Sequence, residues 1–359
     1  LGRPADAEAP AREAWEGRVR ALGPDDPDTL SAGNGLLHTL NALGRDAEAL
    51  PLARRVLEGR ERVLGVDDPK TLDSLENLAL TLDALGQVAE AAPLLERAVE
   101  ARTRVMGPDH PQTLNARASL AANLFDRGEV GPAVAEAEAV LADMTETLGP
   151  GHPGTLATAN DLGRFLVVAG RWEEAIALLR RTAEARADLF GPEAPATLTT
   201  LNNLAGALDI AGRNAEAETL FRRVLALRAR ILGPDHATTV LSRANLATAL
   251  VRSGRAEEAE SYARAAWDWR RAELGPAHPD TLSALNNLGA SLREQDKLAE
   301  AETAFRAVAE GQLARVGPRH PETLMAQSNL GLTLLELDRA EEGTALLRQV
   351  VEGRRAALG

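Results

Sequence analysis

Apolar residues recur along this chain at spacings of three and four, the pattern of a helix with one buried face. One such stretch carries Leu72, Leu75, Leu78, Leu82 and Leu85. Asp68 and Pro69 are placed to begin this helix, because aspartate caps free N–H groups and proline suits the first helical position. Gly86 would end it, so the pattern predicts a first helix, A, over about residues 69–85.

A second helix, B, is predicted over residues 88–106, where Gly107 and Pro108 would stop it. The short turn between A and B favours an antiparallel hairpin, and the whole pattern repeats every 42 residues with no insertion or deletion. The closing glycines are Gly23, Gly65, Gly107, Gly149, Gly191, Gly233, Gly275, Gly317 and Gly359. One hairpin cannot bury both of its faces, so successive hairpins must stack. We therefore predict an all-α fold, a right-handed α-solenoid of about 17 helices.

Two positions in each repeat indicate where helices approach closely. A leucine stands at the same place in every A helix, as at Leu78, and a small residue follows it in seven of the eight repeats, as at Ala79. A second small position lies in helix B: Ala49, Ala91, Ala133, Ala175, Ala217, Ala259, Ala301 and Gly343. Small side chains facing a leucine ridge let two helices pack as ridge and groove.

These residues resemble the tetratricopeptide repeat, in the 42-residue form found in kinesin light chains. The segment from Thr281 to Gly289, followed by Ala299 to Glu302, is close to that pattern, and the resemblance covers the entire chain. It departs from the common shorter form because leucine replaces the large aromatic residues of helix A, as at Leu82 and Leu292. The resemblance implies a protein-binding scaffold. It also suggests a part of a larger protein, since many bacterial proteins carry such arrays beside a nucleotide-switch or regulatory domain.

The predicted organisation is a single solenoid over residues 1–359. Residues 1–23 would form a lone B helix, because Leu1 and Gly2 align with the A–B turn at Leu43 and Gly44, and eight repeats follow from about residue 24. The last B helix closes at Gly359 without a polar capping helix, which solenoid ends normally need. We expect a fragment or a processed chain, with self-association through the uncapped ends as one further prediction.

Composition narrows the choice of partners. The net charge of −13 disfavours nucleic acid and anionic membranes as partners, since both would repel the chain. The absence of cysteine excludes disulfides, thiolate zinc sites and cysteine nucleophiles. No apolar run approaches the roughly 18 residues needed to span a bilayer, and no signal peptide is apparent, so we predict a cytoplasmic protein.

The candidate binding residues lie on helix A, across the helix from its leucines. In arrays of the family this face lines a concave groove, and here it carries an asparagine in five repeats: Asn77, Asn203, Asn245, Asn287 and Asn329. An amide both donates and accepts, so a ladder of asparagines could pair with an extended peptide backbone, as the matching asparagines of similar arrays do. The alternative is that these side chains only bridge adjacent A helices.

Variable positions beside this ladder would supply specificity. The predicted groove residues are His38, Asp73, Asn115, Arg164, Thr199, Thr248 and Ser283. Because the columns are mixed and carry few charges, we expect a peptide or protein segment with small apolar anchors.

No catalytic or metal-binding constellation is found, and no cofactor is predicted. Five of the six histidines, such as His110 and His278, precede an A helix at one repeat position, where a helix cap or linker contact is the simplest role.

Tyr262, Trp267 and Trp269 crowd one B helix; Trp269 is either an anchor on the convex surface or a filler for a packing gap.

The third and fourth repeats depart from the pattern together. Asparagine is lost at Ser119 and Asp161, and Phe125 and the pair Gly131 and Pro132 are further irregularities. We interpret this as a bend or a change of partner surface. Three functions remain open from the sequence: a non-catalytic peptide-binding scaffold, the sensor or autoinhibitory arm of a nucleotide-switch regulator, and a self-assembling array.

Overall fold

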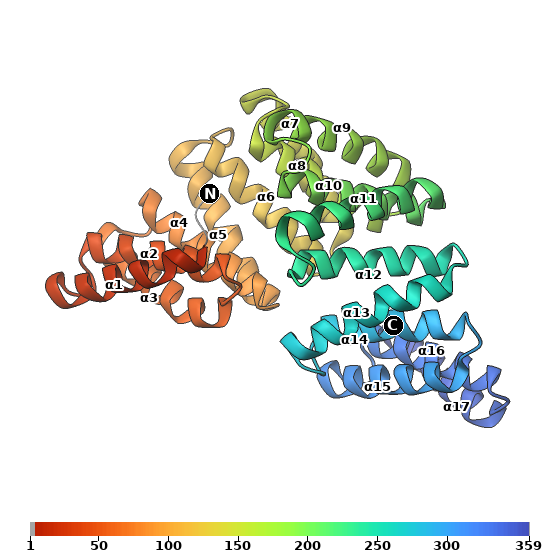
Figure 1. Cartoon of the computed structure of the whole chain (residues 1–359). Helices are drawn as coiled ribbons and strands as arrows, with labels where there is room; N and C mark the ends of the chain where they lie inside the picture. The colour runs from red at the N-terminus through yellow and green to blue at the C-terminus, as the bar shows by residue number, and fades with distance from the viewer. Residues whose placement is uncertain (1–3, 359) are drawn as a thin grey trace. The chain divides into compact units, whose positions relative to one another are not determined.

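The computed structural model describes residues 4–358, which contain 17 α-helices and no strand (Figure 1). The A helices are α2 (Pro27–Ala42), α4 (Pro69–Ala84), α6 (Pro111–Asp126), α8 (Pro153–Val168), α10 (Pro195–Ile210), α12 (Ala237–Arg252), α14 (Pro279–Arg293) and α16 (Pro321–Glu336). The B helices are α1 (Pro4–Leu22), α3 (Asp46–Leu64), α5 (Val88–Met106), α7 (Val130–Leu148), α9 (Trp172–Phe190), α11 (Asn214–Leu232), α13 (Ala256–Leu274), α15 (Leu298–Val316) and α17 (Ala340–Leu358). Repeat 1 is α2 with α3, repeat 2 is α4 with α5, and so on to repeat 8, α16 with α17.

Local chemistry sets the helix ends where the sequence predicts them. Asp68 caps α4, its carboxylate accepting from the Lys70 N–H at 2.9 Å, and Pro69 is the first helical residue. Gly86 and Gly107 follow α4 and α5 with φ of 74° and 95°, a left-handed region that glycine enters without a Cβ penalty. Asp296 and Asp338 hold the same turn position as Gly86 in repeats 7 and 8, with φ of 60° and 58°.

The core is built from the predicted leucine positions of the A helices. The leucines equivalent to Leu78 and Leu82 are buried in seven of the eight repeats, and repeat 3 is the exception, because Leu120 and Leu124 are only partly buried. The alanines at the small position of helix B, from Ala49 to Ala301, are completely buried. At Gly343 an added Cβ would lie 2.8 Å from the Gly331 carbonyl oxygen, so the predicted close approach of the two helices is confirmed.

A second contact, present in most hairpins, sets a small residue on one helix against a large residue on the other. An added Cβ at Gly163 would lie 2.5 Å from Leu179 Cδ2, and one at Gly289 would lie 2.9 Å from Phe305 Cε1. A small residue on helix A therefore faces a large one on helix B. Repeat 1 reverses the order, with Leu37 on α2 and Ala53 on α3 in the same buried cluster.

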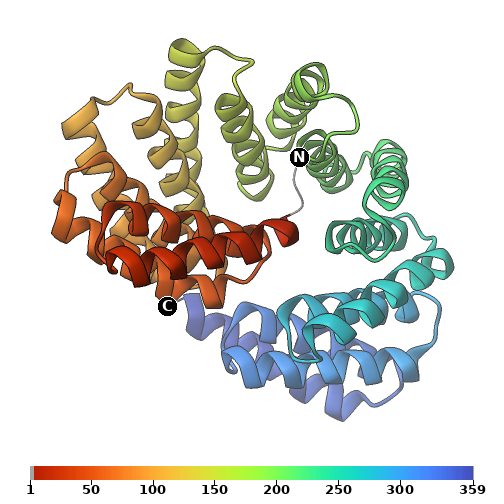
Figure 2. The ribbon, with the colours of Figure 1, turned by 60° about the vertical axis from the view of Figure 1, so that its left-hand side comes forward.

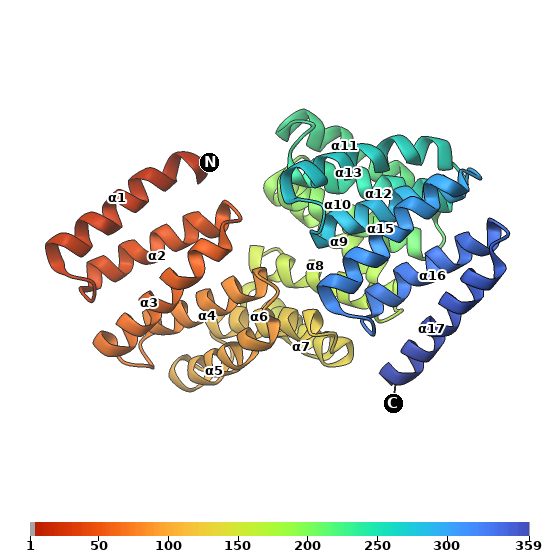
Figure 3. The ribbon, with the colours of Figure 1, turned by 90° about the horizontal axis from the view of Figure 1, so that it is seen from below.

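The chain forms two compact units, unit 1 over residues 1–189 and unit 2 over residues 190–359. In unit 1 the first hairpins, coloured red to orange, lie side by side (Figure 2). In unit 2 the last hairpin shows α16 and α17 running antiparallel (Figure 3). The single continuous solenoid stays a prediction. The expected turn at Leu1 and Gly2 and the closing Gly359 lie outside the described residues.

Candidate functional site

The predicted groove residues lie on one face of the A helices, which we call the open face: in each A helix, the positions equivalent to Asp73, Asn77 and Leu80 of α4. Leu80 is exposed, whereas Asp73 and Asn77 are partly buried. Four of the large apolar side chains that the structure leaves exposed belong to this face: Leu80, Leu241, Met325 and Leu332. Leu80 belongs to unit 1 and the other three to unit 2, and exposed apolar side chains on one face of stacked helices are typical of a surface that contacts another molecule.

Four asparagines of the ladder each donate a hydrogen bond to the A helix before their own. Asn77 Nδ2 on α4 donates to Asn34 Oδ1 on α2 at 3.0 Å, and Asn245 Nδ2 donates to Asn202 Oδ1 at 3.1 Å. Asn329 Nδ2 donates to Asn286 Oδ1 at 2.9 Å. Asn287 donates instead to Thr248 Oγ1, at 3.1 Å. Bridging of adjacent A helices, one of the two roles left open by the sequence, is thus present, and it uses one of the two N–H donors of each amide.

The other predicted residues divide between the two units. In unit 1, His38 and Asn115 are exposed, and Asp73 accepts from Arg102 at 2.8 Å. Arg164, on α8, pairs with Asp161 at 3.4 Å, and its guanidinium carbon lies 5.7 Å from the centre of the Phe125 ring.

In unit 2, Thr199 and Ser283 are exposed, and Thr248 is partly buried. The open-face positions equivalent to Asp73, Asn77 and Leu80 carry no charged residue on α10, α12, α14 or α16. Unit 1 has Asp73, Asp161 and Arg164 at these positions. The two units therefore present chemically different open faces.

A set of buried arginines was missed from the sequence. Arg60, Arg102, Arg186, Arg228 and Arg270 occupy one position of the B helices and are at most 7% exposed. Their spacing by multiples of 42 residues was the available signal. Burial lowers the pKa of Arg60, Arg186, Arg228 and Arg270, but a guanidinium stays charged at neutral pH.

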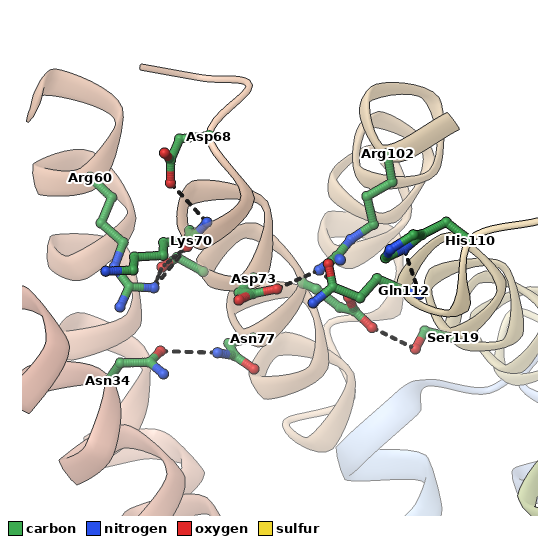
Figure 4. A network of polar contacts seen from close by, with 12 residues as sticks. Asn34, Arg60, Asp68, Lys70, Asp73, Asn77, Arg102, His110, Gln112 and Ser119 are labelled. Atoms are coloured by element: carbon green, nitrogen blue, oxygen red, sulfur yellow. Dashed lines mark hydrogen bonds and ion pairs between the residues drawn. The ribbon is translucent and has the colours of Figure 1, made fainter. Parts of the chain in front are cut away.

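Three of these arginines connect their B helix to the next A helix. Arg60 Nη1 donates to the Lys70 carbonyl at 2.7 Å and to Ser74 Oγ at 2.8 Å (Figure 4). Arg228 repeats this with the Thr238 carbonyl at 3.2 Å and Ser242 Oγ at 2.9 Å, and Arg270 donates to the Asp280 carbonyl at 3.0 Å. Each of these three arginines satisfies a carbonyl in the first turn of the next A helix, so they hold consecutive repeats together.

Arg102 behaves differently, as Figure 4 shows. Its Nη2 donates to Asp73 Oδ1 at 2.8 Å and to Glu76 Oε2 at 3.0 Å, both on α4 of its own repeat. The guanidinium is therefore paired with two carboxylates, one of which is the open-face residue Asp73.

The histidines and Trp269 also have defined positions. His110 caps α6, its Nδ1 accepting from the Gln112 N–H at 3.2 Å, and the equivalent residues cap α8, α12, α14 and α16, which confirms the predicted cap.

Trp269 is partly buried and packs against Val240, Ala244 and Ala266. That contact corresponds to the packing role that the sequence left open, and its role as a surface anchor stays a prediction. Residues 4–358 hold no group of three or more potential metal-ligating side chains.

Models of the tetratricopeptide repeat match residues 34–104, 84–143, 157–230, 208–268, 245–314 and 280–356, and a further model of this repeat matches residues 1–28. The chain belongs to the tetratricopeptide repeat family. Proteins of this family generally act as scaffolds for protein interaction, and the matches indicate no catalytic family. No curated protein matches this sequence.

Several solved structures resemble the chain. A putative kinesin light chain from Podosopora anserina, with nearly identical repeats, is 30% identical, over 58% of this chain and 97% of that chain, with a TM-score of 0.47. A tetratricopeptide repeat protein from Parabacteroides merdae is 12% identical, over 90% and 99% of the two chains, with a TM-score of 0.54. The apo form of RapI is 13% identical, over 79% and 97%, with a TM-score of 0.60. The last two show a shared fold.

Proposed function

We propose that the chain is a non-catalytic scaffold whose open face binds an extended peptide or protein segment, with unit 2 as the main binding region. The observation that carries the proposal is the composition of that face in unit 2. Leu241, Met325 and Leu332 are 42%, 51% and 42% exposed, and the open-face positions of α10, α12, α14 and α16 carry no charged residue. Asn245, Asn287 and Asn329 lie between these positions, one per A helix.

The asparagines suit a backbone partner even though they also hold the stack. Each amide has a second N–H donor and a carbonyl acceptor beyond the N–H that binds the preceding helix. An extended peptide lying across α12, α14 and α16 would meet one amide per helix, which gives backbone pairing that does not depend on peptide side chains. Apolar side chains of the peptide would contact Leu241 at one end and Met325 and Leu332 at the other.

The test uses charge on the open face, because an exposed leucine can be changed without removing a stacking bond. Leu332→Glu places a carboxylate on the open face of α16, and Leu313→Glu makes the same change on α15, where Leu313 is equally exposed at 42%. Partners captured from cell extract by the parent chain would be quantified for both variants, after circular dichroism shows equal helicity and equal melting temperature. We expect at least roughly tenfold less capture with Leu332→Glu and unchanged capture with Leu313→Glu.

Equal capture by the two variants would contradict the proposal, since it would place the contact away from the open face. Asn287→Ala is a weaker probe, because it also removes the bond to Thr248 and so lowers stability.

Two other sequence predictions, a regulatory arm of a nucleotide-switch protein and self-association through the ends, stay predictions, as does a cytoplasmic location. Within residues 4–358, no helix combines the length and the apolar character that crossing a membrane requires.

A further inference from the structure

The junction between repeats 2 and 3 of unit 1, where residues 107–110 join α5 to α6, lacks contacts that other junctions of the described chain have. The first is an ion pair on the side of the B helices. Such a pair joins α1 to α3 through Arg12 and Glu48 at 2.6 Å, and α3 to α5 through Arg54 and Glu90 at 3.2 Å. Among the described residues, no ion pair joins α5, or the turn before it, to α7, or the turn before it.

The missing pair has a cause in the sequence of the A–B turns. Arg171, before α9, pairs with Glu138 of α7 at 2.8 Å. In unit 2, Lys297 pairs with Glu260 at 2.7 Å, and Arg339 pairs with Glu302 at 2.7 Å. The turn before α7 has Glu129 at the same position, which reverses the charge.

The second missing contact is the buried arginine. Arg60, Arg228 and Arg270 each donate to a carbonyl of the next A helix, whereas Arg102 turns to Asp73 and Glu76 of its own repeat. Within residues 4–358, no hydrogen bond from Arg102 reaches α6, and its Nε and Nη1 are buried without a partner. The junction after repeat 2 therefore lacks the arginine connection from its B helix to the next A helix.

The third difference is apolar packing. Ala121 on α6 and Ala137 on α7 are both small and buried, at the two positions where most other hairpins set a small residue against a large one. Leu120 and Leu124 of α6 are correspondingly only partly buried. The core of repeat 3 therefore buries fewer large apolar side chains, which lowers the cost of moving α7 relative to repeat 2.

Hydrogen bonds from α6 still cross the junction, to α4 and to the first residue of α5. Asn123 Nδ2 on α6 donates to Asp83 Oδ1 on α4 at 2.7 Å and to the Val88 carbonyl at 3.0 Å. Ser119 Oγ donates to Glu76 Oε1 at 3.2 Å. Burial raises the pKa of both Glu76 and Asp83, and both carboxylates accept hydrogen bonds across the junction.

From this asymmetry we infer that unit 1 has a built-in hinge between repeats 2 and 3. The contacts of α6 with α4 and α5 are the pivot, and α7 moves away from α5 because, among the described residues, no ion pair joins these two B helices and Arg102 makes no hydrogen bond to α6. The motion changes the angle between the open faces of α4 and α6, and so changes the shape of the open face of unit 1. This inference concerns the fold and stands whether or not the open face binds a peptide.

The experiment measures distance distributions by double electron–electron resonance in the full chain. The chain has no cysteine, so pairs of introduced cysteines can be spin-labelled specifically. Glu58→Cys with Ala142→Cys joins α3 to α7 across the hinge, and Ala226→Cys with Glu310→Cys joins the equivalent exposed positions of α11 and α15 in unit 2. Both pairs span two junctions, or about 20 Å at 8–10 Å between neighbouring helices.

A third pair, Glu16→Cys with Glu100→Cys, joins α1 to α5 within unit 1 and does not cross the hinge. We expect the distribution across the hinge to be roughly twofold broader than the other two. Equal widths in all three pairs would overturn the inference. A broad distribution from α1 to α5 would also overturn it, because it would place the mobility in another junction.

A charge reversal tests the cause. Glu129→Arg places a cation 33 residues after Glu96, the separation of Arg171 from Glu138, and so can restore the missing pair. Glu146→Arg makes the same change in net charge at an exposed position near the other end of α7. We expect Glu129→Arg to narrow the distribution across the hinge to the width found in unit 2, and Glu146→Arg to leave it broad. If Glu129→Arg does not narrow the distance distribution across the hinge, or if both variants narrow it equally, the absence of the ion pair is not the cause of the motion.

Discussion

Repeats 3 and 6 begin from the same packing problem and solve it differently. Both place alanine at the two facing positions of the hairpin, Ala121 with Ala137 in repeat 3 and Ala247 with Ala263 in repeat 6. In repeat 6, Tyr262 and Trp267 pack against the cluster that contains these alanines, and the helix A leucines Leu246 and Leu250 stay fully buried.

Repeat 3 has no such aromatic residues on its B helix, and Leu120 and Leu124 remain partly exposed. Phe125 of α6 instead stacks on Phe165 of α8, with ring centres 4.4 Å apart, which joins repeat 3 to repeat 4. Two hairpins with the same small pair therefore differ in how completely they bury their helix A leucines, because only one of them carries large side chains on helix B to cover the core.

The largest effect is expected from removing an aromatic residue of repeat 6. In repeat 1, Leu30 faces Gly59, where an added Cβ would lie 2.5 Å from Leu30 Cδ2; in repeat 6, the shorter Val240 faces Trp269. Trp269→Gly should lower the free energy of unfolding by about 3 kcal/mol, because it leaves a cavity beside valine. Chemical denaturation followed by circular dichroism measures the change.

A rescue variant shows whether this pair acts as a unit. Val240→Leu combined with Trp269→Gly restores the arrangement of Leu30 and Gly59, and we expect it to recover most of the lost stability. If the double variant is no more stable than Trp269→Gly alone, Trp269 does not compensate for Val240.

The next largest effect is expected in a well-packed hairpin, where a small residue of helix A faces a large residue of helix B. Gly163→Leu on α8 forces a side chain into Leu179, whose Cδ2 would lie 2.5 Å from the new Cβ, and should cost about 2 kcal/mol by overpacking. Gly163→Leu with Leu179→Ala reproduces the order of Leu37 and Ala53 in repeat 1. A melting temperature of the double variant well above that of the single variant is expected, and the reverse order would contradict the exchange.

The smallest effect is expected from adding apolar volume to repeat 3. Ala137→Leu should stabilise repeat 3 by about 1 kcal/mol, because the added side chain buries apolar area where no large residue faces Ala121. Ala263→Leu is the matched control in repeat 6, where Tyr262 and Trp267 already pack and the same change should destabilise. Hydrogen exchange of α6 and α7, compared with α12 and α13, reports each change locally. Equal effects in the two repeats would show that their cores do not differ.

Much of the fold was predictable because it follows from local rules. The cap at Asp68, the stops at Gly86 and Gly107, and the bounds of α4 and α5 agree with the structure, since each depends on residues within one turn of the helix end. The face that carries Asn77 and Leu80 was also predictable, because helical periodicity sets which residues lie opposite the leucines. The departure of repeat 3 was visible as lost asparagine and added glycine and proline, although its physical form was not.

The candidate site was harder to predict from the sequence, because partners come from different helices. Asn287 binds Thr248 whereas Asn245 binds Asn202, although both asparagines hold the same repeat position. Arg60 reaches the next repeat whereas Arg102 turns back to Asp73. The periodic sequence places these side chains at equivalent positions on their helices. The residues around each side chain then determine which of several nearby acceptors it binds.

The sequence by itself determined the repeat length, the helix ends and the faces of the helices, because these properties depend on a few neighbouring residues and on helix geometry. Only the tertiary structure decided which volumes face each other across a hairpin, which carbonyl a buried arginine binds, and which junction lacks its contacts. Those outcomes depend on residues about 10 to 43 positions apart being brought within contact distance, where packing density and the need to satisfy buried polar groups select one arrangement.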